Sequence, residues 1–356
     1  YTLCCYSMED DRFFAEVQVE PDAKNILKYL ARIEKQQSRD CRIVCGYEAG
    51  CLGYSLYHQL HAHGIDCVIL APTTMMTKPG KRIKTDRRDA RLISKCLAFH
   101  TYSPVYIPTE VDDAVKEYIR MRDDANSALA RVKQQIIAFC IRHGKIHDGK
   151  SYWTNKHLEW LSSLDLGNKI LSEVLQEYLI RYYQLREQVD MYDMRINELA
   201  QAEPYRQKVE KLGCFRGIAA HTALSFCVEV GDFRRFATAQ QFASYLGLVP
   251  GECSSGDKQQ YTGITKAGNS HLRKLLVETA QVFGRSATKS GKSVALKERQ
   301  AKCDSLTVAY ADKANARLKK KYFKIAMRSK VNIAKTAVAR EMACFIWGMM
   351  TDNISC

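Results

Sequence analysis

Hydrophobic and polar residues alternate in short blocks through the first hundred positions of the chain. Alternation over a few residues predicts strands, and apolar residues three or four apart predict amphipathic helices. On this basis we expect strands at 2–7, 13–19, 42–47 and 66–71, and helices at 25–37 and 52–63. Strands that alternate with helices indicate a mixed α/β layer.

Two long helical patterns follow, at 111–143 and at about 165–202, separated by a polar linker. Hydrophobic residues of the second recur every seven positions in two sets offset by four, which is the a/d pattern of a coiled coil. The sets are Leu171, Tyr178, Leu185, Tyr192 and Leu199, and Leu175, Tyr182, Val189 and Ile196. This seam fits an antiparallel hairpin with the first helix and a coiled coil between two chains equally well.

The last third of the chain reads as mostly helical. Two helical pieces meet at a turn around Gly217, and helix starts of this kind can present backbone amides to phosphates. Plain helix packing is the alternative explanation of this pattern. The closing apolar pattern at 331–350 is typical of a buried core helix.

Positive charge is concentrated in one part of the chain. The net charge is +15, and residues 206–350 carry 26 Lys and Arg against 10 Asp and Glu. Such an imbalance indicates a polyanionic partner, most simply nucleic acid. The 14 cysteines include no C-x-x-C pair, so we expect buried free thiols in a reducing cytosol. No apolar run is long enough for a membrane helix.

Acidic residues stand out in two places of the first α/β segment. Glu48 follows a predicted strand, and Asp86 and Asp89 begin the helical pattern KTDRRDARL, where Thr85 or Asp86 can act as the cap. Asp86 and Asp89 share a helical face, so with Glu48 they would form an oxygen site suited to Mg²⁺. The alternative is that both are ordinary helix-start acids, paired with the neighbouring arginines.

The stretch 245–276 holds a candidate nucleophile. Ser255 directly precedes Gly256 in a loop of small and polar residues, between an apolar run and a helical pattern. Basic residues surround it, which suits an anionic substrate; an ordinary Ser/Gly turn on a basic surface is the alternative. The candidate nucleic-acid-binding residues are Lys81, Arg82, Lys84, Arg87, Arg88, Lys258, Lys266, Arg273, Lys274, Lys319, Lys320 and Lys321.

Four segments in order resemble one family. They are YEAGCLGY, KTDRRDARL, GCFRGIAAHTAL with VGDFRRF, and YLGLVPGECSSGD with GITKAGNSHLRKLL. Together they resemble the DEDD-type transposases of the insertion-sequence 110 family, which includes Piv-like DNA invertases. The resemblance implies an α/β plus α fold in three parts: a RuvC-like RNase H domain at 1–110, coiled-coil linker helices at 111–205, and a mostly helical transposase domain with the catalytic serine at 206–350.

The resemblance also implies a set of functional residues. Glu48, Asp86 and Asp89 match the last three members of an Asp-Glu-Asp-Asp tetrad that works with Mg²⁺. The first Asp is expected on a first strand that precedes this chain. Ser255 matches the family's catalytic serine. The expected partners are target and donor double-stranded DNA, a noncoding bridge RNA and further copies of the chain in a homodimer or homotetramer. The expected location is the bacterial or archaeal cytoplasm, near the nucleoid.

Two other functions compete with DNA recombination. A metal-dependent junction-resolving nuclease would need the carboxylates but not Ser255. A non-catalytic nucleic-acid-binding protein would need neither, and its binding would weaken strongly with salt. A resolvase-type serine recombinase or a tyrosine recombinase would have no use for an acidic cluster in an α/β domain.

Overall fold

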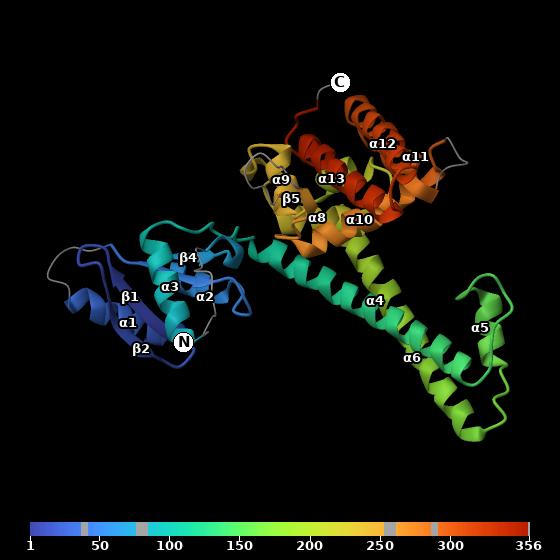
Figure 1. Cartoon of the computed structure of the whole chain (residues 1–356), viewed down its shortest axis with the longest axis horizontal. Helices are drawn as coiled ribbons and strands as arrows, with labels where there is room; N and C mark the ends of the chain where they lie inside the picture. The colour runs from blue at the N-terminus through green and yellow to red at the C-terminus, as the bar shows by residue number, and fades with distance from the viewer. Residues whose placement is uncertain (37–41, 76–84, 253–260, 286–290, 355–356) are drawn as a thin grey trace. The chain divides into compact units, whose positions relative to one another are not determined.

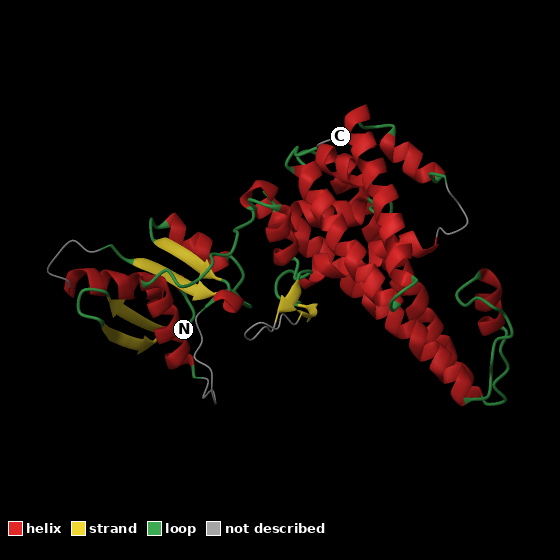
Figure 2. Ribbon diagram, turned by 45° about the horizontal axis from the view of Figure 1, so that its top comes forward, coloured by secondary structure: helices red, strands yellow, loops and turns green. Residues whose placement is uncertain are grey.

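The computed structural model describes residues 1–36, 42–75, 85–252, 261–285 and 291–354. These residues form two compact units, Tyr1–Ile107 and Pro108–Cys356 (Figure 1). Helices predominate and the strands are short (Figure 2). None of the helices in these ranges combines the length and the apolar composition needed to cross a bilayer.

Unit 1 contains two pairs of strands. β1 (Thr2–Ser7) runs antiparallel to β2 (Arg12–Gln18), while β3 (Val44–Glu48) runs parallel to β4 (Asp66–Leu70). A parallel pair needs a crossover connection, which α2 (Ser55–Ala62) provides. Within the described residues the two pairs form separate two-stranded sheets, and an isolated bridge joins Leu70 of β4 to Pro104. The prediction of a mixed α/β layer is confirmed, and the RuvC-like fold stays a prediction.

Two further helices complete unit 1. α1 (Ala23–Gln36) buries a stripe of Ile26, Leu30 and Ile33, as its amphipathic pattern requires. α3 (Asp86–Ala98) follows the short 3-10 helix η1 (Pro72–Thr74) and packs on both β1 and β3. The Thr85 hydroxyl accepts a hydrogen bond from the Arg88 amide and caps α3, so Thr85 is the cap of the two candidates.

Unit 2 begins with a helical hairpin within the chain. α4 (Glu110–Arg142) packs along α6 (Lys169–Gln201), and α5 (Asn155–Ser162) lies at the far end of the pair (Figure 1). The heptad set Leu175, Tyr182, Val189 and Ile196 is buried, and the other set is half-buried. The seam residues therefore pack between the two helices of the hairpin, which was one of the two predicted alternatives. The sequence pattern did not predict α5.

The rest of unit 2 is a helical core. Its elements are α7 (Arg206–Gly213), α8 (Ala220–Val230), the 3-10 helix η2 (Phe233–Arg235), α9 (Ala239–Tyr245), β5 (Pro250–Glu252), β6 (Tyr261–Ile264), α10 (Ser270–Arg285), α11 (Val294–Gln300), α12 (Ser305–Ala326) and α13 (Val331–Met350). α13 contacts α9, α10 and α12 and buries residues along most of its length. Its predicted role as a core helix is confirmed.

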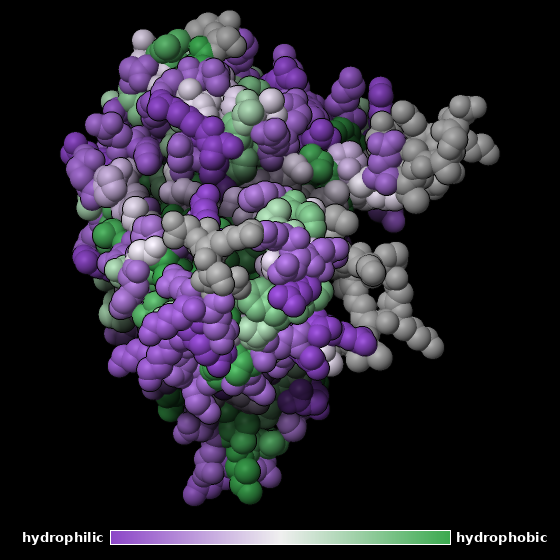
Figure 3. Space-filling model, turned by 90° about the vertical axis from the view of Figure 1, so that its left-hand side faces the viewer, coloured by the Kyte–Doolittle hydropathy of each residue, from purple (hydrophilic) through white to green (hydrophobic). Residues whose placement is uncertain are grey.

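On the face shown in Figure 3, hydrophilic side chains dominate and hydrophobic ones are scattered among them in small groups. Several large apolar side chains on α6 nevertheless face water, among them Ile170, Met191 and Met194. Isolated exposed apolar residues are common on protein surfaces and need no special explanation.

Candidate active site

The candidate nucleophile belongs to a segment flanked by a β-hairpin. β5 pairs antiparallel with β6, with Pro250 opposite Ile264 and Glu252 opposite Tyr261. Ser255 and Lys258 fall between these strands in the sequence and lie outside the described residues, as do Lys81, Arg82 and Lys84. The described part of this site is therefore the base of the β5–β6 hairpin and the elements that hold it.

The chain beyond β6 folds tightly against the end of α9. Gly268 has φ +106°, and a Cβ at this position would lie 2.0 Å from the Tyr245 carbonyl oxygen. Gly247 has φ +64°, and a Cβ there would lie 2.4 Å from the Ala267 carbonyl oxygen. Both the backbone angles and the close approach demand glycine. The Asn269 amide also donates to the Tyr245 carbonyl at 2.9 Å, so the hairpin base is clamped onto α9.

A buried carboxylate holds the start of α10. Glu229 lies on α8 with a side chain that is 3% exposed. It accepts a hydrogen bond from Asn269 Nδ2 at 2.5 Å and contacts His271 Nδ1 at 2.5 Å. Arg120 Nη2 lies 3.3 Å from the same carboxylate. A buried charge needs such partners, so Glu229 ties α8 to the segment that directly follows the hairpin.

His271 is held from its other side by α4. Its Nε2 lies 2.7 Å from Asp123 Oδ2, while Nδ1 faces Glu229. His221 Nε2 lies 2.9 Å from Asp123 Oδ1, in an alignment that does not make a hydrogen bond. Arg122 also contacts Asp123 at 3.0 Å. We call Asp123, His271 and Glu229 the histidine bridge.

The bridge extends to the second helix of the hairpin. Arg122 donates from Nε and Nη2 to the two carboxylate oxygens of Asp193 on α6, at 2.7 and 2.9 Å. A two-point contact of this kind fixes orientation as well as distance. Side chains from α4, α6, α8 and α10 thus form one continuous charged network inside unit 2.

The surroundings of the bridge keep His271 charged near neutral pH. Burial lowers the pKa of His271, but its hydrogen bonds to Asp123 and Glu229 outweigh this and raise the pKa to about 9. Burial raises the pKa of Glu229, yet the hydrogen bond and positive charge of His271 bring it below its usual range. The Asp123 pKa is likewise lowered by His221, His271 and Arg122 despite burial.

Sequence reasoning missed this network. Asp123, Glu229 and His271 are far apart in the chain, and only tertiary packing joins them. One signal was available: Glu229 is the only acidic side chain in the mostly apolar AHTALSFCVEV helix. A lone carboxylate in such a helix must find a buried partner.

The predicted acidic residues all lie in unit 1. Glu48 is the last residue of β3 and is half-buried, while Asp86 and Asp89 occupy the first turn of α3. In the part of the chain that the structure describes, no side-chain hydrogen bond or ion pair engages these three carboxylates. Glu16 provides a contrast, because Arg87 and Arg91 both pair with it.

The packing of unit 1 sets the direction of β3. Cys45 interacts electrostatically with Cys5, and Tyr47 with Tyr1, so β3 runs opposite to β1. α3 runs in the same direction as β1, because Ser94 contacts Cys4 and, just after the end of α3, the ring of Phe99 meets that of Tyr6.

Glu48 and the start of α3 therefore lie toward the same end of unit 1. Their oxygen donors suit a divalent ion, and no other described side chain engages them. Within the described ranges, however, no group of three or more His, Cys, Asp or Glu side chains is placed to hold a metal ion. The three acids share a region without forming a closed metal cage.

The predicted nucleic-acid-binding residues have different environments. Arg273 donates from Nη1 to the Leu246 carbonyl at 2.9 Å and so helps to close the end of α9. Lys321 pairs with Glu341, whereas Lys320 is exposed. Lys266, Lys274 and Arg88 are exposed, Lys319 is half-buried, and Arg87 pairs with Glu16.

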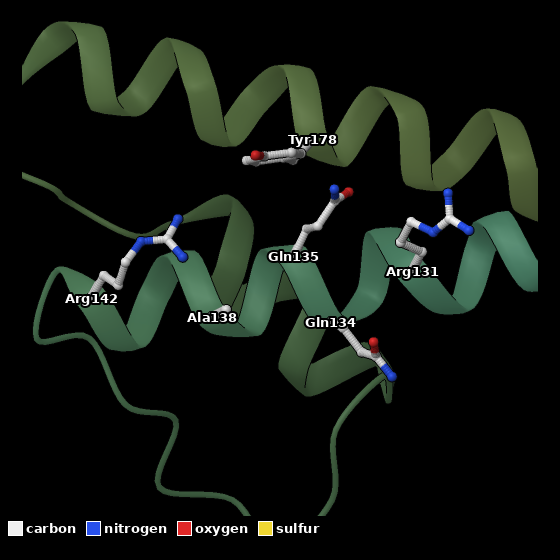
Figure 4. A pocket seen from close by; sticks show the side chains of 6 residues that line it. All are labelled: Arg131, Gln134, Gln135, Ala138, Arg142 and Tyr178. Atoms are coloured by element: carbon white, nitrogen blue, oxygen red, sulfur yellow. The ribbon is translucent and has the colours of Figure 1, made fainter.

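A shallow groove runs between α4 and α6, and none of the predicted site residues lines it. Figure 4 shows Arg131 and Arg142 toward its two ends, with Tyr178 of α6 across from Gln135. No Asp or Glu occurs between positions 125 and 147, so the α4 side of the groove is basic. The groove is too open to enclose a small substrate.

Comparison with known proteins identifies relatives along most of the chain. A model described as the transposase IS116/IS110/IS902 family matches residues 210–299, and a DEDD transposase model of IS110 matches residues 1–141. The putative transposase y4qE of Sinorhizobium fredii is 36% identical over 307 residues, which cover 86% of this chain and 75% of that protein. The transposase for insertion sequence element IS1533 of Leptospira borgpetersenii is 32% identical over 314 residues, covering 86% and 88%.

Proposed function

Because the chain belongs to the IS116/IS110/IS902 family of transposases, we propose that it cuts and rejoins DNA with Ser255 as the nucleophile. Glu48, Asp86 and Asp89 act with it at the same phosphate. The observation that supports a role for these acids is the placement of three carboxylates, which have no side-chain partner among the described residues, toward one end of unit 1. The tight clamp on the β5–β6 hairpin adds support, because a reacting group needs a rigid base.

The proposed chemistry conserves the energy of the phosphodiester bond. The Ser255 hydroxyl oxygen attacks phosphorus, its proton passes to a nearby base, and the bond to one DNA oxygen breaks. That DNA end leaves as a free hydroxyl, and the other end stays linked as a phosphoserine. A hydroxyl from a second DNA end then attacks the phosphoserine, which restores a phosphodiester and releases the serine.

The carboxylates account for how a weak nucleophile is activated. A serine hydroxyl is a poor nucleophile at neutral pH and needs assistance. Glu48, Asp86 and Asp89 would hold Mg²⁺, which supplies charge stabilisation at the phosphate. Oxygen donors of this kind match the preference of that ion, and the membership of the chain in a DEDD transposase family favours it.

The nucleic-acid partners follow from charge and family. Target and donor DNA are the substrates, and the excess of basic residues at 206–350 suits binding of polyanions. We also propose that a noncoding bridge RNA guides the choice of DNA sites. Purifying the full-length protein and sequencing the RNA that accompanies it tests this; a defined RNA encoded by the element supports it, and sequence-specific duplex binding without RNA contradicts it.

Replacement of the nucleophile is the direct test of the chemistry. Ser255→Ala should abolish covalent protein–DNA adducts, and Ser254→Ala is the matched control because it removes the neighbouring hydroxyl only. Adducts are detected on denaturing gels with labelled DNA. If adducts persisted in Ser255→Ala and vanished in Ser254→Ala, the nucleophile would be Ser254 and the proposed assignment would be wrong.

Replacement of an acid separates recombination from the alternatives. Asp86→Ala should lose strand cleavage while nucleic-acid binding continues. Asp22→Ala, which removes an exposed acid elsewhere in unit 1, is the control. A junction-resolving nuclease would keep Mg²⁺-dependent cleavage in Ser255→Ala, and a non-catalytic binding protein would show no cleavage in any variant.

A further inference from the structure

We infer that the histidine bridge of Asp123, His271 and Glu229 is a positioning device for the β5–β6 hairpin, and that His271 acts as a positioning residue for Ser255. This inference rests on the proposed function of Ser255. His271 follows β6 in the chain, and the two carboxylates of the bridge come from α4 and α8 of unit 2. It therefore joins the hairpin base to α4 and α8 at the same point.

The geometry leaves little freedom at this junction. His271 is gripped at both ring nitrogens, and its side chain is 15% exposed. Asn269, two residues earlier, donates to Glu229 and accepts a hydrogen bond from the Leu272 amide at 3.0 Å. Between β6 and α10 the chain is thus fixed by side chains as well as by the glycine contacts with α9. Fixing this segment fixes the position at which β6 ends.

Plain core packing does not require this arrangement. A buried ion pair stabilises little more than apolar residues of the same shape, because desolvation offsets the attraction. Networks of this kind are best at specifying one arrangement among several. The charged groups that face His271 are Asp123 from α4 and Glu229 from α8, with Arg120, Arg122 and His221 in contact with these carboxylates and Asp193 of α6 bound to Arg122.

The test measures adduct formation and local dynamics in the same variants. His271→Gln keeps a polar side chain but cannot carry the positive charge. Under single-turnover conditions we expect its rate of covalent adduct formation to fall at least about tenfold, since small misplacements of a reacting group are costly. Glu278→Gln, an exposed change on the same helix, should leave that rate unchanged.

Hydrogen–deuterium exchange distinguishes positioning from general destabilisation. In His271→Gln, exchange should accelerate in peptides from 261–272 and stay unchanged in α13. DNA binding should also remain within about twofold of the wild type. Faster exchange throughout unit 2, or an adduct rate within twofold of the wild type, would overturn the inference.

A second variant guards against failure to fold. Asp123→Asn retains an oxygen acceptor for His271 but removes one charge, and the same local exchange signature is expected. An unchanged adduct rate and unchanged exchange at 261–272 in this variant would also overturn the inference. If Ser255→Ala still formed adducts, the proposed function would fail, while local exchange in the bridge variants would still report whether the bridge holds the hairpin base.

Discussion

The histidine bridge predicts a specific loss of stability in mild alkali. A raised pKa means that the folded protein holds the His271 proton more tightly than the unfolded chain does. The stabilisation is fully present below about pH 6.5, which is the ordinary pKa of histidine. It is lost as the pH rises through the pKa of His271 in the folded protein, about 9. The carboxylates of Asp123 and Glu229, whose pKa values are lowered, act in the opposite range. Their stabilisation is present above about pH 4 and is lost in acid.

The shift of the His271 pKa sets the size of the effect. A change from 6.5 to about 9 corresponds to about 3 kcal/mol at 1.36 kcal/mol per pH unit. The side chain is mostly buried, so solvent screening reduces this figure little. The wild-type protein should therefore lose about 3 kcal/mol more stability between pH 6.5 and 9 than His271→Gln, which has no proton to release.

Tryptophan fluorescence is the appropriate assay. Trp153, Trp160 and Trp347 are the three tryptophans of the chain, and all lie in unit 2, so urea unfolding followed by their emission reports on this unit. Free energies of unfolding are measured at pH 6.5, 7.5, 8.5 and 9 for both proteins. Parallel curves, with the same loss in His271→Gln as in the wild type, would refute the assignment of a charged His271 at neutral pH.

Three further predictions use the same unfolding and binding assays. Gly268→Ala should cost at least about 2 kcal/mol because a Cβ meets a backbone carbonyl at positive φ, whereas Gly263→Ala, with open space around it, should cost less than about 1 kcal/mol. Val189→Asp buries a charge in the hairpin seam and should cost several kcal/mol, while Met191→Asp on the exposed face should leave the unfolding midpoint unchanged; equal effects would contradict the hairpin. Lys320→Gln should reduce the salt dependence of DNA binding by about one unit of log–log slope, and an unchanged slope would place this lysine away from DNA.

Much of the fold could be predicted from periodicity alone. The helices of the hairpin and α13 are long and strongly patterned, and the structure places them within a few residues of expectation. The seam residues were identified, but the choice between hairpin and dimer depended on which surface packs on them. α5 was missed because eight residues between polar segments give too short a pattern.

The candidate site could be predicted only in part. Glu48, Asp86 and Asp89 stand at element ends, where a sequence pattern can place them, and they share one end of unit 1. The histidine bridge could not be found this way, because Asp123 and His271 are 148 residues apart. Arg273 illustrates the same limit: a basic residue beside the serine loop reads as a phosphate ligand, yet its guanidinium closes the end of a helix.

The length of α4 gives the histidine bridge a wider consequence. From Asp123 to the end of α4 at Arg142 the helix rises by about 28 Å, and a tilt of about 2° around Asp123 moves that far end by about 1 Å. The histidine bridge contacts α4 at Asp123, the point about which this tilt is taken. Pulling on the far tip of the helix pair would load the contact between Asp123 and His271, so a displacement of the tip would reach the start of α10.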